Sequence, residues 1–142
     1  KSDEKVLKLV LKNRYFTKSP PKSIDKFYFS LKPFMKLKFY DACATISSFT
    51  AKSILREIRK FKADTIVITG GGVKNKCIVN LLKRTLKSNL YLINQFDLDQ
   101  DFIEAQAFAY LAIRKLKGLP ISFPGTTGTS HPVSGGKIVN YR

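Results

Sequence analysis

The sequence predicts an α/β protein in which helices pack on a short parallel sheet. Two short runs rich in β-branched and other apolar residues, 65–69 and 89–94, are typical of buried strands. Helical patterns precede, separate and follow them at 40–61, 75–87 and 101–117. Strands joined by a helical crossover normally lie parallel in one sheet, so this order predicts a parallel pair.

The segment before the first strand contains two predicted helices and an intervening loop. Residues 5–16 carry apolar side chains at helical spacing, which predicts a short amphipathic helix. Ser19-Pro20-Pro21-Lys22-Ser23 predicts a loop, because proline cannot continue a helix. We expect one helical turn at 27–31 and then the long helix 40–61, whose apolar residues fall near one stripe.

The segment after the second strand begins with an expected helix cap. Asp101 is placed to cap the helix 101–117, with Glu104 at the third helical position completing a capping box. Gly118 ends this helix and a proline follows soon after. Residues 121–142 predict an irregular tail without a helix, with one closing strand at 137–140.

The helices outnumber the strands that they should cover. Two or three strands make a small sheet, so we expect the chain to lack sheet partners. At 142 residues, the chain corresponds to about one domain, and we treat 1–142 as a single partial domain.

The charge balance bears on binding partners. Lys and Arg number 26 against 10 Asp and Glu, giving a net charge of +16. The excess is mostly lysine spread along the chain, without the signature of a nucleic-acid-binding motif, so solvated lysine faces are favoured over specific nucleic-acid binding.

No run of eighteen apolar residues is present, which argues against a membrane span, and no secretion signal follows Lys1. Cys43 and Cys77 are isolated and predict small buried residues in a reducing compartment, not a metal site or disulfide.

The most informative stretch is the glycine turn, Gly70-Gly71-Gly72, between the first strand and the helix opened by Asn75. Glycines allow a sharp turn and the close approach of a ligand to the backbone. Asn75 is a plausible helix cap, and amides at that helix start would face a nucleotide sugar or phosphate. A strand-to-helix connector without a ligand explains the residues equally well. The spacing matches neither the Walker A motif nor the G-x-G-x-x-G fingerprint.

Two further places have polar residues that suit a ligand. Glu104 opens an alanine-rich helix, where a carboxylate could accept hydrogen bonds from sugar hydroxyls; a self-capping glutamate on a packed helix is the simpler alternative. Lys22 and Ser23 present a cation and a hydroxyl to a phosphate or sugar, although a surface loop in a lysine-rich protein is the commoner explanation.

Several ordered segments together resemble the C-terminal half of anhydro-N-acetylmuramic acid kinase, a family of the sugar kinase, heat-shock chaperone and actin superfamily. The matching stretches are Tyr15-Phe16 with Pro20-Pro21-Lys22-Ser23, Asp41-Ala42-Cys43-Ala44-Thr45-Ile46 with Phe49-Thr50-Ala51, Gly70-Gly71-Gly72 with Asn75, Glu104-Ala105-Gln106-Ala107-Phe108-Ala109-Tyr110-Leu111-Ala112, and Pro120-Ile121-Ser122-Phe123-Pro124-Gly125-Thr126-Thr127-Gly128. No single motif is decisive, but the ordered set is specific and covers nearly the whole chain.

The resemblance implies an incomplete C-terminal lobe of an actin-like (ribonuclease H-like) ATPase fold. It implies a cytoplasmic, ATP- and Mg²⁺-dependent kinase of cell-wall recycling, which opens 1,6-anhydro-N-acetylmuramic acid with water to give N-acetylmuramic acid 6-phosphate. The turn matching Gly70, Gly71 and Gly72 would contact the adenosine part of ATP, and we assign Asn75 to the same nucleotide-binding site. The glutamate matching Glu104 would face the anhydro-amino-sugar.

The departures from the family are as informative as the matches. The family's phosphate-binding Gly-Thr-Ser loop and the catalytic aspartate of its Asp-Thr-Gly-Pro-Gly-Asn segment are absent, and both precede the matched region. After Lys22-Ser23 the family usually continues Thr-Gly-Arg-Glu, whereas here Ile24-Asp25-Lys26-Phe27 stands. We therefore assign no catalytic or metal-binding residue and expect the isolated chain to be inactive without a missing N-terminal lobe. A non-catalytic remnant or basic binding module is the alternative, and homodimerisation is left open.

Overall fold

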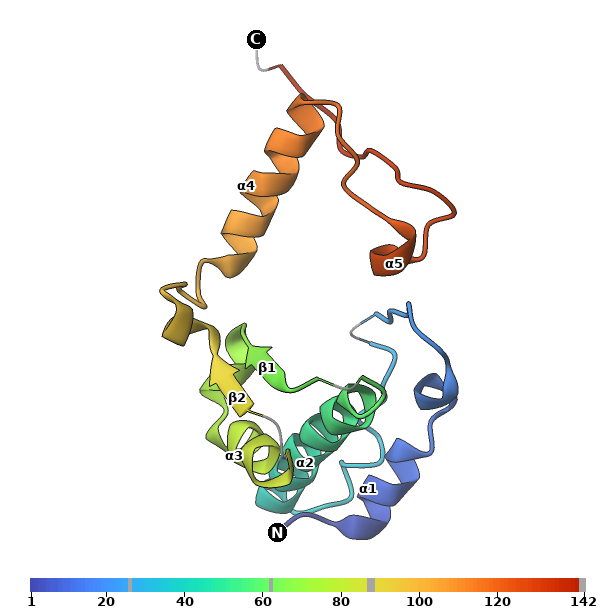
Figure 1. Ribbon diagram of the computed structural model, residues 1–142. Helices are drawn as coiled ribbons and strands as arrows, with labels where there is room; N and C mark the ends of the chain where they lie inside the picture. The colour runs from blue at the N-terminus through green and yellow to red at the C-terminus, as the bar shows by residue number, and fades with distance from the viewer. Residues whose placement is uncertain (26, 62, 87–88, 141–142) are drawn as a thin grey trace. The chain divides into compact units, whose positions relative to one another are not determined.

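The computed structural model describes residues 1–25, 27–61, 63–86 and 89–140, and its helices and strands are drawn in Figure 1. The chain divides into two compact units. The first comprises Lys1–Lys18 and Asp25–Asp101, and the second comprises Ser19–Ile24 and Phe102–Arg142. The structure is α/β with a short parallel sheet, as predicted; that 1–142 is one partial domain stays a prediction.

The first unit contains the sheet. Its elements are α1 (Glu4–Leu11), the 3₁₀ turn η1 (Arg14–Thr17), α2 (Phe39–Ile58), β1 (Thr65–Ile68), η2 (Gly71–Lys74), α3 (Lys76–Thr85), β2 (Asn89–Leu92) and η3 (Ile93–Phe96). Strands β1 and β2 pair in parallel, with Thr65 opposite Asn89 and Ile68 opposite Leu92. The predicted parallel pair is therefore confirmed, since α3 is the crossover that connects its two strands (Figure 1).

The core of the first unit lies where α2 packs against α3. Ala51, Leu55 and Leu82 are buried there. The partly buried side chains around them are Ile54, Ile78, Leu81, Leu86 and Leu90. Leu86 follows α3 and Leu90 lies in β2, while the other apolar positions recur at helical spacing on α2 and α3. Removing these side chains from water stabilises the packing of the helices at about 25 cal/mol per Å² of apolar surface.

A buried threonine connects α1 to α2. The hydroxyl of Thr45, which is fully buried, donates to the backbone oxygen of Asp41 at 2.6 Å and accepts from the backbone amide of Asp3 at 2.9 Å. The carboxylate of Asp3 in turn caps α1 by accepting from the amides of Lys5 and Val6. The start of α1 is thereby fixed against one side of α2.

The second unit contains α4 (Ile103–Leu116) and the short helix α5 (Pro124–Thr127). Gly118 has φ of +66°, and its amide donates to the carbonyl of Lys115 while the amide of Leu119 donates to that of Arg114. This pair of bonds is a Schellman motif, which confirms Gly118 as the residue that ends α4. An isolated antiparallel bridge joins Ser122 to Val133 in the tail.

The long helices are confirmed with shifted ends, but several local predictions are wrong. The first helix ends at Leu11, because the side chain of Asn13 accepts from the amide of Tyr15 and starts the turn η1. Residues 27–31 form turns without a helix. The tail contains the helix α5, and residues 137–140 form no strand.

The expectation that both cysteines are buried is also wrong. Cys43 and Cys77 are exposed. Each precedes a buried residue by two positions, Thr45 on α2 and Val79 on α3. Two residues correspond to about 200° around a helix, so each thiol lies on the opposite face from the buried side chain.

None of the helices in the described part of the chain combines the length and the apolar character that spanning a membrane requires.

Candidate functional site

The glycine turn follows the carboxyl end of β1 in the first unit. Gly70 adopts φ of +85°, a conformation that disfavours any side chain, whereas Gly71 and Gly72 open η2 with ordinary backbone angles. A Cβ built on any of the three meets no atom within 4 Å. Packing within this unit therefore does not require glycine at Gly71 or Gly72, and open space faces the turn.

A cavity of about 310 Å³ adjoins this turn. Gly72, Thr69 and Val73 line it on the side of the turn. The rest of the lining comes from α2, β1 and α3, namely Thr50, Ile54, Val67, Ile68, Ile78, Val79 and Leu82. Its volume is at the lower end of the range of about 300–1,000 Å³ for small-molecule sites, and its mainly apolar walls suit a flat, weakly polar group.

Asn75 caps α3, as the sequence predicts. Its side-chain oxygen accepts from the amides of Cys77 at 3.0 Å and Ile78 at 3.3 Å. These amides are therefore engaged by the cap and do not face a ligand, contrary to what we expected of the start of this helix. The side-chain nitrogen of Asn75 donates to Ser47 of α2 at 3.4 Å, which ties the turn to the long helix.

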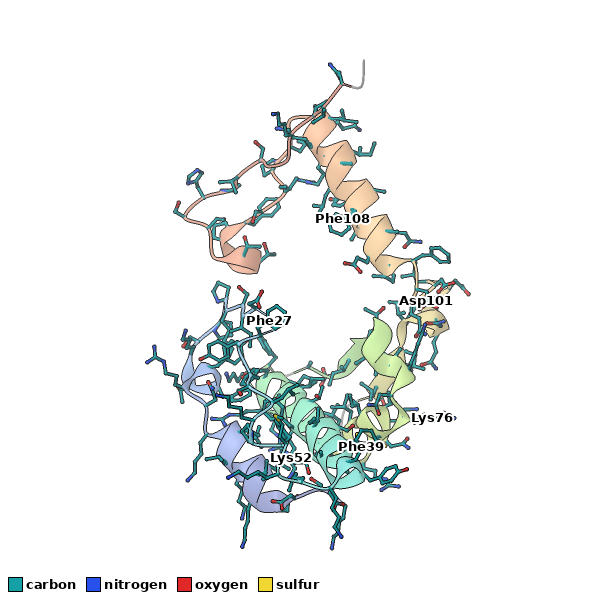
Figure 2. All side chains as sticks on the ribbon, turned by 180° about the vertical axis from the view of Figure 1, so that it is seen from behind. Phe27, Phe39, Lys52, Lys76, Asp101 and Phe108 are labelled. Atoms are coloured by element: carbon teal, nitrogen blue, oxygen red, sulfur yellow. The ribbon has the colours of Figure 1, made fainter. Side chains whose placement is uncertain are left out.

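An ion pair fixes the other end of the turn. The ammonium of Lys74, the last residue of η2, lies 2.8 Å from a carboxylate oxygen of Asp101. This hydrogen bond, together with the negative charge of Asp101, raises the pKa of Lys74 above its usual value. Both side chains are more than half exposed, so salt screens the attraction between them. Figure 2 labels Asp101 in the segment that leads to α4.

This ion pair explains why the predicted capping box does not form. The helix α4 begins at Ile103 with Phe102 at the cap position and no side-chain cap hydrogen bond. Asp101 therefore lies one residue too early, and its carboxylate pairs with Lys74 instead. Glu104 is then the second helical residue and not the third, so the geometry of the box is lost.

The remaining predicted site residues lie in the second unit. Glu104 is exposed in the first turn of α4. Lys22 and Ser23 follow Pro21, whose ring lies beside Gly128, since a Cβ on that glycine would come within 3.1 Å of it. The structure thus brings the Lys22–Ser23 loop to the tail after α5. It places the glycine turn with Asn75 in one unit and Glu104 with this loop in the other.

Sequence reasoning missed the residues that act through distant contacts. Ser47 and Lys74 support the two ends of the glycine turn, but their partners lie 28 and 27 positions away along the chain. Hydroxyl and ammonium groups are common in this sequence, so no local pattern marks either one. Only the position of Lys74, two residues after the last glycine of the turn, gives a signal that could have identified it.

The chain matches the family model of anhydro-N-acetylmuramic acid kinase over residues 1–141. The chain belongs to the anhydro-N-acetylmuramic acid kinase family. It is 39% identical over 131 residues to the anhydro-N-acetylmuramic acid kinase of Zymomonas mobilis, covering 91% of this chain and 36% of that protein. It is 42% identical over 139 residues to the kinase of Phenylobacterium zucineum, covering 96% of this chain and 38% of the relative.

The curated anhydro-N-acetylmuramic acid kinases that match this chain are much longer than it is. The chain spans little more than a third of the curated relatives that it matches, and the match is to their C-terminal portion. A third relative, the anhydro-N-acetylmuramic acid kinase of Caulobacter vibrioides, is 41% identical over 139 residues and is covered to 38% of its length.

Proposed function

We propose that this chain forms the C-terminal, nucleotide-side part of an ATP-dependent kinase that acts on 1,6-anhydro-N-acetylmuramic acid in the cytoplasm. In this reaction water adds to the anomeric carbon, the anhydro bond breaks, and the freed 6-oxygen takes the γ-phosphoryl group of ATP. The products are N-acetylmuramic acid 6-phosphate and ADP. The proposal rests on family membership and on one observation, the side-chain-free turn that borders a cavity at the end of β1.

The glycine turn is the proposed contact for the adenosine part of ATP. Ile54, Ile78 and other apolar side chains of the cavity suit the faces of an adenine ring. The absence of Cβ atoms at Gly71 and Gly72 lets a ribose or phosphate approach the backbone closely. In this proposal Asn75 orders the turn through its cap on α3 and its contact with Ser47, without itself donating to the nucleotide.

Binding of the anhydro-sugar is assigned to residues of the second unit. Glu104 would accept hydrogen bonds from sugar hydroxyls, and charge-assisted bonds of this kind are stronger than neutral ones. Lys22 and Ser23 are proposed as further contacts to a phosphate or sugar. We propose that this chain forms the incomplete C-terminal lobe of an actin-like fold. The loop that cradles the phosphates and the aspartate that activates water are assigned to the remaining N-terminal lobe, in the same or a separate chain.

Mg²⁺ is proposed from the resemblance alone. The described residues bring together no group of three His, Cys, Asp or Glu side chains that could hold a metal ion. The residues that the structure describes therefore do not fit a dedicated Mg²⁺ site. The work of this chain is to bind and orient the two substrates.

Replacement of Gly71 by valine tests the nucleotide site. A Cβ at this position meets open space, so Gly71→Val should fold normally, but the added side chain should obstruct a nucleotide that lies against the turn. In the complete enzyme we expect ATP affinity, measured by isothermal titration calorimetry, to fall about tenfold or more, which is about 1.4 kcal/mol.

Gly125→Val is the matched control, because Gly125 also faces open space and lies in α5, which belongs to the second unit and not to the unit of the turn. Both variants should keep their melting temperatures, and Gly125→Val should bind ATP normally. Unchanged ATP affinity in Gly71→Val would reduce the turn to a structural connector.

A further inference from the structure

A basic groove runs between α2 and α3 on the first unit. It has a volume of about 350 Å³. Ala51 and Leu55 of α2 and Leu81 of α3 supply its apolar residues, and Thr85 closes the α3 side. Three cations complete the lining, Lys52 and Arg56 of α2 and Arg59, the residue that caps the C-terminal end of α2, and no carboxylate is among the described residues that line it.

The three cations form a row. They are spaced four and three residues apart, and Arg59 keeps helical backbone angles just after the end of α2, so the three lie on one face and span about 10 Å along the helix axis. Figure 2 labels Lys52, the first of the row. A row of this length offers several positive charges to one extended ligand, whereas a ligand with a single negative charge would use one or two of them.

The middle cation is held in place. A guanidinium nitrogen of Arg56 donates to the backbone oxygen of Leu11 at 2.9 Å, and the guanidinium carbon lies 5.2 Å from the centre of the Phe16 ring. One bond occupies few of the donors of a guanidinium, so the others remain for a ligand, and little side-chain entropy is lost when it binds.

The outer cations are available as well. Lys52 pairs with Glu4 at 3.2 Å, but both side chains are well exposed, and such pairs contribute only about 0–1 kcal/mol. The exposed guanidinium of Arg59 has no ion-pair or hydrogen-bond partner among the residues that the structure describes. An incoming carboxylate therefore replaces one weak pair at most.

The chemistry of the groove selects among possible occupants. A second copy of this chain carries the same net charge of +16 and is disfavoured by charge repulsion. Single-stranded nucleic acid is usually held by basic grooves with aromatic stacking platforms, and none of the described residues that line this groove is aromatic. A helix with an acidic face and an apolar stripe matches both the row of cations and the apolar floor.

We propose that the groove between α2 and α3 docks an acidic amphipathic helix of a partner polypeptide. Apolar side chains of that helix enter between Leu55 and Leu81, and its carboxylates, spaced by three or four residues, face Lys52, Arg56 and Arg59. The charged rim raises the association rate and sets the register, while the apolar floor supplies contact area. The site is separate from the glycine turn, so the proposal is independent of the kinase reaction.

A synthetic helical peptide tests the proposal. The probe is an 18-residue, fluorescein-labelled peptide with glutamates at positions i, i+4 and i+7 and a leucine stripe beside them. Its binding to the 142-residue chain is measured by fluorescence anisotropy at 150 mM salt, with a scrambled peptide of the same composition as reference. We expect the helical peptide to bind at least about tenfold more tightly than the scrambled one.

Two groove variants have matched controls on α3. Arg59→Glu reverses a rim charge, and Lys83→Glu makes the same change on the opposite side of α3 from Leu81 and Thr85. Thr85→Phe fills the groove, and Asn80→Phe adds the same ring at an exposed position that does not line it. We expect each groove variant to weaken binding about tenfold and each control less than about twofold, with unchanged circular dichroism.

Four results would overturn the proposal. Equal binding of the scrambled peptide, or equal loss in Lys83→Glu and Arg59→Glu, would mean nonspecific attraction of anions to a basic protein. Full displacement of the peptide by sodium dodecanoate at stoichiometric concentration would assign the groove to a small amphiphile. Normal binding by Thr85→Phe would place the peptide elsewhere on the surface.

Discussion

The sequence leaves two roles open for Glu104, a cap of its own helix and a ligand of the sugar, and the structure around it distinguishes between them. As a cap it would have to accept from backbone amides at the start of α4, but that start has no side-chain cap hydrogen bond. Its charge still lies in the first helical turn, where the helix dipole favours an anion by about 0.3–1 kcal/mol. The capping alternative is therefore contradicted for this chain, and the ligand role stays a proposal.

The change Glu104→Gln tests the sugar-binding role. Amide and carboxylate have nearly the same shape, so the substitution removes the charge and weakens charge-assisted hydrogen bonds to sugar hydroxyls. In the complete enzyme we expect kcat/KM for the anhydro-sugar to fall about tenfold or more, with ATP affinity unchanged and a stability loss below about 1 kcal/mol.

Steady-state kinetics and thermal melting together check this expectation. Gln106→Glu serves as a control, because it places a carboxylate two positions further along the same exposed helix. Normal turnover in Glu104→Gln would show that the carboxylate does not contact the sugar.

Helices, strands and helix ends could be predicted from the sequence where they depend only on neighbouring residues. Alternating helical and β-branched patterns predicted the parallel pair, and Gly118 marked the end of α4, because periodicity and a left-handed glycine are properties of a few neighbouring residues. The start of α4 was predicted wrongly because Asp101 pairs with Lys74, which is 27 residues earlier in the sequence. For the candidate site, the glycine turn and the cap by Asn75 could be predicted, whereas the cavity beside them depends on how α2 packs.

The Schellman motif at the end of α4 can be tested directly. An L-residue in the left-handed conformation of Gly118 is disfavoured by roughly 1–2 kcal/mol, although nothing lies within 4 Å of an added Cβ. We therefore expect Gly118→Ala to lower the free energy of unfolding by about 1 kcal/mol, as measured by urea denaturation followed by circular dichroism.

Gly125→Ala is the comparison for this motif, since it adds the same methyl group in equally open space without a positive φ. That variant should be neutral or slightly stabilising, because alanine reduces the conformational freedom of the unfolded chain. Equal destabilisation by both changes would mean that the left-handed conformation is not what makes glycine preferable at position 118.

At the scale of the whole molecule, the sheet is small for the helices around it. The described part of the chain has one two-stranded sheet, and large apolar side chains such as Phe39, Phe108 and Leu116 are exposed. Exposed apolar surface on this scale marks places where other protein surfaces bind. These observations agree with a chain that spans little more than a third of its relatives.

We expect that this chain alone does not phosphorylate 1,6-anhydro-N-acetylmuramic acid. Phosphoryl transfer depends on positioning the phosphates and stabilising their charge, and the groups that we propose for this work belong to the N-terminal lobe. We expect no ATP- and sugar-dependent product from the purified chain by mass spectrometry, and recovery of activity when a separately expressed N-terminal lobe of a relative is added. Product formed by the chain alone would contradict the assignment of these groups to the other lobe. Recovery that is lost in Gly71→Val but kept in Gly125→Val would connect the activity to the glycine turn, because both changes leave the fold of this chain unstrained.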